Sequence, residues 1–434
     1  MNHPNSIAPK RILVIGAGAA GMMAAYAVAG DRTQVTVVEK NAKTGVKILM
    51  SGGTRCNLTQ DTDPAGITAT FGHAKRFLQP SVGKFPPQRV VEMFHSLGVA
   101  TKRENTGKIF PQSDRAADVR NALYNQMINA GCELLPRSPV RDLCLGSDGR
   151  FEVFLDDRTL SADVVIVTAG GKSWPGSGTT GDAYEWLRKL GHTIVRPRPA
   201  LVPIVGGEDD LRALSGMTFD DASVSVRKRL PSGELQPGKK GLLTTRRSSV
   251  LLTHFGLSGP AVMDVSGTMT GFKSFDDCGL EIDWTPSVNE DQWLARLNGG
   301  GKANTLAGCL REGLPHRMVD LIVNRSGGNL GIAELSKQQR RECISQIKAM
   351  TIPAHTTRGF EKAEVTAGGV SLSEVDPRTM ASRIVPGLFI AGEVLDVDGY
   401  IGGYNFQAAF STGRAAGLSA AEYAATIQDR ECQT

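Results

Sequence analysis

The sequence has little of what would place it outside the ordinary globular proteins. Only 6% of its 434 residues are aromatic, 21% are charged, and the formal net charge is +5. So small a positive excess over this length argues against a nucleic-acid-binding protein. A hydrophobic content of 41% excludes collagen-like, coiled-coil and disordered chains. The length is sufficient for two or three domains.

Paired cysteines are also lacking. The seven cysteines are odd in number, and none stands in a C-x-x-C pair. This pattern disfavours a disulfide framework and a zinc site, so we expect no metal and a reducing, cytoplasmic location. Cys56 lies in a glycine-rich motif but has no nearby cysteine, so we interpret it as a packed structural residue rather than a redox thiol.

No hydrophobic run is long enough to predict a transmembrane helix. The uncharged stretch 12–30 follows Lys10 and Arg11 and in this respect is similar to a signal peptide. However, four glycines interrupt it, and it divides into a short β-type run followed by a glycine-rich turn and helix. We therefore expect no membrane association.

The order of β-type and helical patterns predicts an α/β fold. Two strands, at 12–15 and 35–39, flank a helical pattern, and such a βαβ unit implies a parallel sheet. The unbroken apolar run 164–167 is typical of a strand inside a sheet covered on both faces. Before this strand, the β-type runs 140–145 and 151–155 and Leu160 predict a β-meander. A further apolar strand is expected at 388–391.

Between these parts the character of the chain changes twice. Short β-type runs fill residues 201–286, and helical patterns fill residues 287–351. The sequence therefore predicts a Rossmann-like domain made of residues 1–200 and 352–434. A β-barrel-like module and a small helical module interrupt this domain. The helices expected in the helical module lie at 292–297, 305–324 and 332–350.

Residues 16–21, GAGAAG, have the spacing G-x-G-x-x-G between a predicted strand and a predicted helix. Gly16 allows the sharp turn, Gly18 lets a pyrophosphate approach the backbone, and Gly21 lets the helix pack closely. The helix N-terminus would stabilise the phosphate charge. Glu39, at the end of the second strand, would accept hydrogen bonds from a ribose diol. Together these elements predict dinucleotide binding.

Two later motifs indicate which dinucleotide is bound. Small residues at 168–171 follow one apolar strand, and Gly392-Glu393 follows another, with Gly402-Gly403 opening the last helix. In flavoproteins a late element of this kind serves the ribityl chain and the flavin ring. No second G-x-G-x-x-G follows a strand, as a separate nicotinamide domain would require. These observations favour FAD over NAD.

Two further motifs carry candidate functional residues. In the glycine-rich loop 45–59, Lys47 and Arg55 could pair with the FAD phosphates. His254, in the Gly/Ser/Pro-rich segment 253–260, could be an acid or base near the flavin. The alternative for His254 is a hydrogen-bonded core histidine at the end of a strand.

The motifs together resemble those of the BaiN-like flavoproteins, also described as aminoacetone-oxidase-type FAD-binding enzymes. The resemblance covers nearly the whole chain and implies an FAD domain of the glutathione-reductase type with a β-barrel-like and a helical insert. One departure is Thr54, where many members have a glycine. The segments that carry the resemblance are GAGAAG at 16–21, SGGTRCNLT at 51–59, KIFPQSDRAADV at 108–119, THFGLSGPA at 253–261, GFEKAEVTAGGV at 359–370 and AGEVLDVDGYIGGYNFQAAFSTGRAAG at 391–417.

The motifs and the resemblance together give a set of expected FAD contacts, with Val140 acting through its backbone at the adenine. No catalytic residue is predicted. The expected cofactor-binding residues are Gly16, Ala17, Gly18, Ala19, Ala20, Gly21, Glu39, Lys40, Lys47, Gly53, Arg55, Asn57, Val140, Ala169, Gly170, Gly392, Glu393, Gly403, Asn405 and Phe406.

The expected function is that of an FAD-dependent oxidoreductase. Hydride would pass between the flavin and a small organic substrate, in a pocket between the FAD domain and the insert. The resemblance implies an unsaturated ring ketone or an amine as substrate, and NADH or NADPH is a candidate electron donor. The alternatives are a flavin-bound RNA-modification protein, which the weak positive charge disfavours, and a non-catalytic flavoprotein redox sensor. We expect no nucleic-acid partner, and the oligomeric state stays open.

Overall fold

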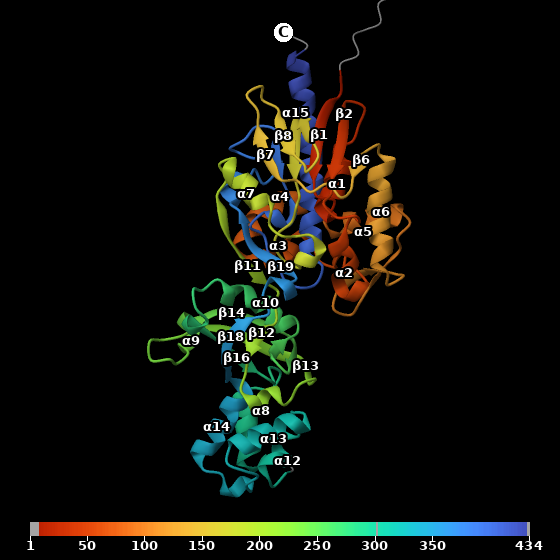
Figure 1. Ribbon diagram of the computed structural model, residues 1–434. Helices are drawn as coiled ribbons and strands as arrows, with labels where there is room; N and C mark the ends of the chain where they lie inside the picture. The colour runs from red at the N-terminus through yellow and green to blue at the C-terminus, as the bar shows by residue number, and fades with distance from the viewer. Residues whose placement is uncertain (1–7, 301–302, 432–434) are drawn as a thin grey trace, which may run out of the picture. The chain divides into compact units, whose positions relative to one another are not determined.

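The computed structural model describes residues 8–300 and 303–431. The chain divides into two compact units. The first, here called the discontinuous unit, contains residues up to Pro197 and from Val365 onward, and the second, the inserted unit, is Arg198–Glu364. In Figure 1 the discontinuous unit contains both ends of the colour scale, red and blue. The finer division of the chain at 200, 286 and 351 stays a prediction.

A parallel sheet of five strands forms the centre of the discontinuous unit. Every neighbouring pair in it is parallel. Strands from before and after the inserted unit therefore share one sheet, which confirms the predicted α/β class. In spatial order the strands are β20 (Leu388–Ile390), β10 (Val164–Val167), β1 (Lys10–Ile15), β2 (Thr33–Val38) and β6 (Glu133–Leu135).

The first and last helices of the discontinuous unit pack against each other through small residues. A Cβ atom at Gly413 or Gly417 of α15 (Tyr404–Glu431) would collide with backbone oxygens of Ala20 and Ala24 in α1 (Ala19–Val28). Only glycine permits so close an approach of two helix backbones. The contact ties the last helix of the chain to the helix that follows the glycine fingerprint (Figure 1).

Smaller elements complete the discontinuous unit. The predicted β-meander is confirmed as an antiparallel sheet of β7 (Asp142–Leu145), β8 (Phe151–Phe154) and β9 (Thr159–Ala162). The other strands are β3 (Thr59–Gln60), β4 (Thr101–Arg103), β5 (Lys108–Pro111), β11 (Ile194–Ala200) and β19 (Val365–Val370). The other helices are α2 (Val46–Thr54), α3 (Pro64–Thr68), α4 (Lys75–Lys84), α5 (Pro87–Ser96), α6 (Ala116–Asn129) and α7 (Ala183–Lys189), with the short turns η1 (Ala69–Ala74), η2 (Pro175–Ser177), η7 (Leu372–Glu374) and η8 (Gly392–Val394). The turn η6 (Phe360–Lys362) belongs to the inserted unit.

The inserted unit contains an antiparallel sheet of seven strands. The two edge strands, β17 (Met350–Ile352) and β18 (Ala354–Thr357), are separated along the chain only by Pro353. The two edges of the sheet are therefore held next to each other, and the sheet curls into the barrel-like form that the sequence predicts. Between the edges, in spatial order, lie β16 (Cys278–Asp283), β13 (Thr218–Lys228), β14 (Leu242–Thr253), β15 (Gly256–Ser258) and β12 (Ile204–Gly206).

The helices of the inserted unit share one hydrophobic core with this sheet, which includes Trp284 and Trp293. Two of the predicted helices are wrong as continuous elements. Pro315 has no N–H and stands as the N-cap of α13, so the expected helix 305–324 is broken there. Ser336 caps α14 by accepting from the N–H of Gln339, so the expected helix 332–350 begins five residues late. The helices are α8 (Asp209–Arg212), α9 (Gly238–Gly241), α10 (Pro260–Thr270), α11 (Glu290–Ala295), α12 (Leu306–Leu310), α13 (His316–Arg325) and α14 (Lys337–Lys348), with the turns η3 (Phe275–Asp277), η4 (Arg296–Gly300) and η5 (Ile332–Glu334).

Two findings concern absences among residues 8–300 and 303–431. No helix in these ranges is long and apolar enough to cross a membrane. Six of the cysteines lie in them and all six are free thiols, whereas Cys432 lies outside the described residues.

Candidate cofactor site

The predicted motifs meet at the carboxyl edge of the parallel sheet. Four neighbouring strands end level with one another, because Ile15 pairs with Val38 and Val167, and Val167 pairs with Ile390. In open α/β sheets ligands bind at this edge. The segments that follow these strands are residues 16–21, 39–40, 168–171 and 391–393.

The glycine fingerprint has the geometry expected of a phosphate-binding turn. Gly16 has a φ of 99°, and a Cβ there would lie 2.8 Å from the backbone oxygen of Thr168. A Cβ at Gly21 would collide with the Gly16 carbonyl. Gly18, the N-cap of α1, instead faces open space, with nothing within 4 Å of its Cβ position and no side chain capping the helix. The N-terminus of α1 is thus open to an anion.

Glu39 joins the turn after β1 to the end of β2. Its carboxylate is buried, with 7% of the residue exposed, and accepts the N–H groups of Ala17 at 2.9 Å and Asn41 at 2.8 Å. A carboxylate has further lone pairs, so these bonds leave acceptor capacity for ribose hydroxyls. The backbone N–H of Ser138 donates to the Glu39 carbonyl, which brings the segment of Val140 alongside.

Lys40, the next predicted contact, is engaged elsewhere. Its Nζ donates to Asp182 at 2.8 Å and to the Thr180 hydroxyl at 2.6 Å. This ion pair lies at the surface, where such pairs contribute little to stability.

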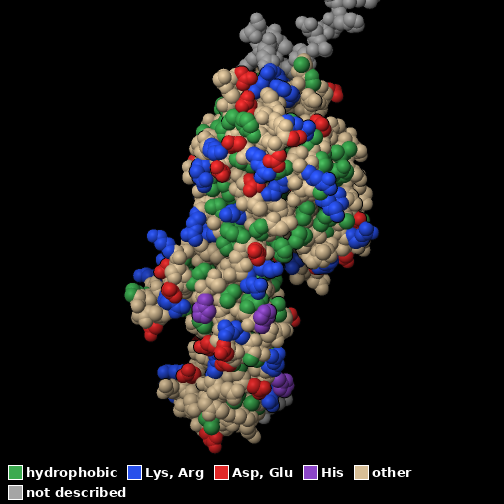
Figure 2. All heavy atoms as spheres, viewed as in Figure 1, with side chains coloured by type: hydrophobic (Ala, Val, Ile, Leu, Met, Phe, Trp, Pro, Cys, Tyr) green, Lys and Arg blue, Asp and Glu red, His purple; other side chains and the backbone are tan. Residues whose placement is uncertain are grey.

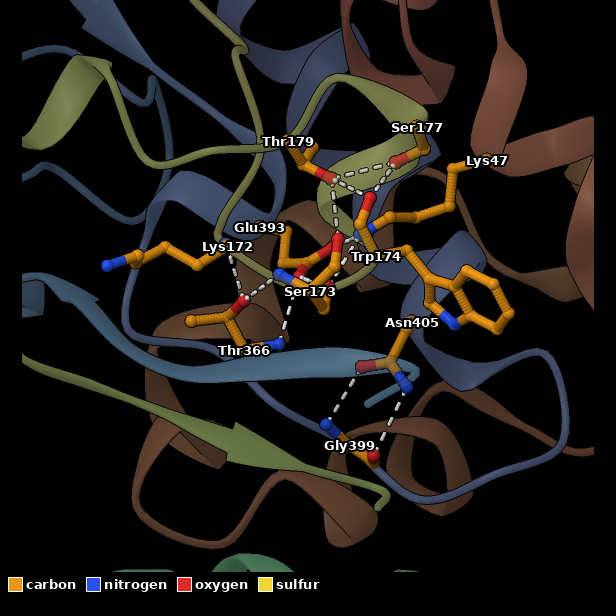
Figure 3. A network of polar contacts seen from close by, with 10 residues as sticks. All are labelled: Lys47, Lys172, Ser173, Trp174, Ser177, Thr179, Thr366, Glu393, Gly399 and Asn405. Atoms are coloured by element: carbon orange, nitrogen blue, oxygen red, sulfur yellow. Dashed lines mark hydrogen bonds and ion pairs between the residues drawn. The ribbon is translucent and has the colours of Figure 1, made fainter. Parts of the chain in front are cut away.

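Glu393 is the centre of a polar network built from distant parts of the chain (Figure 3). Its Oε1 accepts the Ser173 hydroxyl at 2.6 Å and the Thr366 N–H at 2.9 Å. Its Oε2 accepts Lys47 Nζ at 2.7 Å, and Lys47 also donates to the Ser173 hydroxyl at 2.7 Å. The contacts hold the carboxylate in one orientation at the sheet edge.

Sequence reasoning missed two members of this network, Ser173 and Thr366. Both are fully buried. Ser173 stands two residues after the predicted 168–171 segment, and Thr366 lies in the resembling block 359–370. The small residues around them were the available signal, but only the fold brings the two hydroxyls together.

A buried amide lies at the N-terminus of α15. Asn57 is 8% exposed, and its Oδ1 finds no hydrogen-bond partner in the described part of the chain. Gly403, with a φ of 89°, leaves the room that Oδ1 occupies, because a Cβ there would lie 2.8 Å from it. A buried acceptor left unpaired beside a helix N-terminus suits a ligand that carries its own N–H donor.

Asn405 fixes the loop that precedes this helix end. Its Oδ1 accepts the Gly399 N–H at 2.9 Å, and its Nδ2 donates to the carbonyls of Gly399 at 3.1 Å and Tyr400 at 3.2 Å (Figure 3). The side chain therefore acts through the backbone of its own loop.

The loop after Lys47 has unusual backbone geometry. Gly52, Gly53 and Thr54 are consecutive residues with φ of 55°, 67° and 69°. A β-branched residue such as Thr54 rarely adopts this left-handed region. Arg55 is engaged with protein partners, since it pairs with Glu104 at 2.7 Å and lies 4.1 Å over the Phe110 ring.

Two residues had alternative interpretations. Cys56 is fully buried, and burial raises the pKa of its thiol to about 12, which disfavours the reactive thiolate. His254 is exposed in the turn between β14 and β15, where its ring meets the edge of Phe255. The interpretation of His254 as a core histidine is therefore wrong, because the turn directs its side chain outward.

The remaining predicted contacts lie on the same segments. Phe406, in the first turn of α15, stacks on Phe410 with ring centroids 6.0 Å apart. The other predicted contacts are Ala19 and Ala20 in α1, Ala169 and Gly170 after β10, and Gly392 after β20.

Among residues 8–300 and 303–431, no group of three or more His, Cys, Asp and Glu side chains is placed to hold a metal ion.

A parallel sheet with a glycine fingerprint, an acid after its second strand and a late Gly-Glu element defines a flavin-dependent Rossmann oxidoreductase. The chain belongs to the HI0933-like family, since the family description "HI0933-like protein Rossmann domain" matches residues 10–419. At the level of fold alone, FrdA of Escherichia coli quinol fumarate reductase is similar, with a TM-score of 0.50 and 17% identity. That match covers 96% of this chain and 71% of FrdA.

Three relatives of known activity align over nearly their whole length. The 3-dehydro-bile acid delta(4,6)-reductase of Clostridium scindens is 31% identical over 421 residues, 95% of this chain and 99% of the relative. The ribosomal RNA dihydrouridine synthases of Escherichia coli and Haemophilus influenzae are 29% and 30% identical. These matches cover 92% and 94% of this chain, and 95% and 97% of the relatives. The relatives are enzymes, as the sequence predicts for this protein.

Proposed function

We propose that the protein is an FAD-dependent reductase that saturates a carbon–carbon double bond conjugated with a carbonyl group in a ring. The observation that carries the proposal is the meeting of three features at one sheet edge. These are the open helix N-terminus at Gly18, the buried carboxylate of Glu39, and the Glu393–Lys47 pair. Each suits a different part of one extended dinucleotide.

FAD fits the residues present better than FMN does. The pyrophosphate would lie at Gly18, the adenosine ribose at Glu39, and the ribityl chain at Glu393. The flavin ring would lie by the N-terminus of α15, where the Asn57 oxygen, which has no hydrogen-bond partner in the described residues, would accept an N–H. FMN would leave Gly18 and Glu39 unused. The bound flavin supplies hydride chemistry, while these residues bind and orient it.

The substrate class follows from what the relatives' reactions share. A 3-dehydro bile acid carries a ring ketone, and its delta-4 double bond is conjugated with that ketone. Formation of dihydrouridine saturates a ring double bond conjugated with a carbonyl of uracil. Both reactions add a hydride and a proton across such a bond. We therefore assign this shared chemistry to the protein and prefer it to amine oxidation.

A small ring ketone is the first candidate substrate. On the face drawn in Figure 2, Lys and Arg side chains are interspersed with Asp and Glu. Together with a net charge of only +5, this offers weak attraction for RNA phosphates. Uridine in ribosomal RNA is the second candidate, and the two synthases that align over 95% and 97% of their length favour it.

Cofactor identification and two half-reactions test the proposal. The purified protein should be yellow and should release FAD, not FMN, when denatured. NADH and NADPH are offered anaerobically as reductants, with dithionite as the alternative. The reduced flavin is then mixed with cyclic enones or with ribosomal RNA that lacks dihydrouridine, and amines are offered separately to the oxidised flavin, which they would reduce. Reoxidation by enones supports the proposal, and reoxidation by RNA alone supports the second candidate. Colourless protein that FAD cannot reconstitute, or reduced flavin that none of these acceptors oxidises, contradicts it.

A further inference from the structure

Trp174 stands in a rare backbone conformation beside the Glu393 network. It follows Ser173 in the loop between β10 and α7, and its φ and ψ are 52° and 66°. Residues other than glycine seldom adopt this left-handed region, and a bulky one does so only where its surroundings impose it.

Hydroxyl groups on both sides of Trp174 impose this conformation. Its carbonyl accepts the Ser177 hydroxyl at 2.7 Å and the Ser177 N–H at 2.8 Å. The carbonyl of the preceding Ser173 accepts the Thr179 hydroxyl at 2.6 Å. The Ser173 N–H donates to the Thr366 hydroxyl at 3.0 Å. The peptide groups before and after Trp174 are therefore both fixed.

The direction of the indole distinguishes it from the polar groups that hold its backbone. Figure 3 shows the ring pointing away from the contacts of Ser173 and Glu393, on the side of Lys47 and Asn405. Trp174 is only partly buried, so the described residues leave part of it exposed. The backbone that carries this flat apolar surface is thus fixed next to the residues to which we assign the flavin.

We propose that Trp174 determines substrate specificity by stacking its indole against the flat conjugated ring of the substrate, an inference that rests on the proposed function. Planar rings bind aromatic side chains by offset stacking, and the gain grows with the area in contact. Because the backbone of Trp174 is already fixed, only the two side-chain torsions of the indole have to become ordered when a ring binds. An open-chain enone offers less flat surface, so it should gain less from Trp174.

The first test is binding to the FAD-loaded enzyme, measured without turnover. The probe is 4-nitrophenol, a flat ring that the flavin does not reduce as an enone, followed by the change it causes in the visible flavin spectrum. Trp174→Ala should raise the dissociation constant about tenfold, the size expected for one lost stacking contact. Trp174→Phe should return it to within about threefold of the wild type. Trp186→Phe, a change at a buried tryptophan of α7 outside the network, is the control and should leave it unchanged.

The second test compares a ring with an open chain as substrates. For 2-cyclohexenone, Trp174→Ala should raise KM about tenfold, and for 3-buten-2-one by less than about threefold. Trp174→Gly repeats the test with a residue that tolerates the left-handed backbone, in case the alanine variant is unstable.

The outcomes separate this inference from the proposed function. An unchanged dissociation constant in Trp174→Ala, or no binding of the phenol to the wild type, overturns the stacking role. Loss of FAD from Trp174→Ala also overturns it, because the indole would then hold the cofactor. If the wild type reduces neither enone, the proposed function fails, while the phenol comparison still decides whether Trp174 binds a ring.

Discussion

The two units differ in where their backbone departs from ordinary geometry. Seven residues other than glycine have positive φ among those described, and the discontinuous unit holds all but one. Such conformations persist where the surroundings enforce them, and they gather at functional sites. The inserted unit is instead built from long strands and capped helices around one core. The seven are Thr54, Cys56, Asp114, Arg137, Trp174 and Met380 in the discontinuous unit and Leu201 in the inserted unit.

The units also use ion pairs differently. In the inserted unit Arg227 and Glu281, 2.7 Å apart, join the neighbouring strands β13 and β16. In the discontinuous unit Lys47 and Glu393, also 2.7 Å apart, join segments from the two sides of the insert. The same chemistry supports a sheet in one unit and assembles a candidate site in the other.

The largest expected effect comes from removing whole segments. Joining Pro197 to Val365 by a short Gly/Ser linker should leave FAD binding intact. The ends of the insert lie together, as the Glu364 N–H donates to the Leu201 carbonyl at 3.0 Å. A chain ending at Met350 should lose FAD entirely, since β20 and α15 are missing. FAD per protein after gel filtration measures both. Tight FAD in the chain ending at Met350 would contradict the shared site.

Glu393→Ala should weaken FAD binding by about 3 kcal/mol, roughly a hundredfold, because it removes charged hydrogen bonds and leaves Lys47 without its partner. Glu281→Ala is the matched control in the inserted unit, and it should lower thermal stability while leaving FAD affinity unchanged. Titration of apoprotein with FAD gives both values. Equal losses of affinity in the two variants would remove the distinction between the units.

Glu39→Ala should weaken FAD binding by about 1.5–3 kcal/mol if the carboxylate accepts a ribose hydroxyl. Glu39→Gln keeps one acceptor oxygen and should lie between the wild type and the alanine variant. The measurement is the FAD dissociation constant by fluorescence. Unchanged affinity in both variants would reduce Glu39 to a structural link between Ala17 and Asn41.

Acid should destabilise the discontinuous unit through His192. Its ring is buried between Glu374 at 3.1 Å and the Ser382 hydroxyl at 2.9 Å. Burial holds its pKa below the usual 6.5, against the opposing effect of the hydrogen bond that the Glu374 carboxylate accepts from the ring. The unfolded chain therefore binds the proton more readily. The contribution of neutral His192 to the free energy of unfolding is therefore complete above about pH 6.5. It is lost as the pH falls below that value, by at most about 1.4 kcal/mol per pH unit for one proton.

His192→Gln should flatten the dependence of stability on pH below about pH 6.5, as measured by denaturant unfolding at several pH values. The pKa of His73 is shifted in the opposite direction, because its hydrogen bond to Asp396 raises it, so its effect on stability has the opposite dependence on pH. Its contribution is complete below about pH 6.5 and is lost as the pH rises through the folded-state pKa. An unchanged pH profile in His192→Gln would show that His192 titrates alike in the folded and unfolded chains.

The smallest expected effect is a gain in stability. Thr54→Gly should stabilise the protein by about 0.5 kcal/mol, since relief of the left-handed backbone slightly exceeds the entropic cost of glycine. Thr356→Gly, at an exposed extended position of β18, should destabilise by about 1 kcal/mol. Thermal midpoints compare the pair. Destabilisation by both changes would show that the φ of 69° at Thr54 carries no strain.

The sequence predicted the features that depend on local rules. Gly16 and Gly21 could be assigned because only glycine fits a close approach, and 164–167 because an all-apolar run is typical of a covered strand. Thr366 could not be found in this way, because its hydroxyl accepts from Lys172, 194 residues away in the chain. The outward direction of His254 likewise depends on the turn between β14 and β15 and not on its apolar neighbours.

The shared parallel sheet has a consequence for synthesis of the chain. The buried edge of β10 pairs with β20, with Val165 opposite Leu388, roughly 220 residues later. At about 5–20 residues per second, a ribosome needs about 10–45 s to make that stretch. During this time the apolar edge of β10 has no partner strand, and such edges are prone to aggregation. The inserted unit is continuous in sequence, so its own strands are complete before the unit that surrounds it can close.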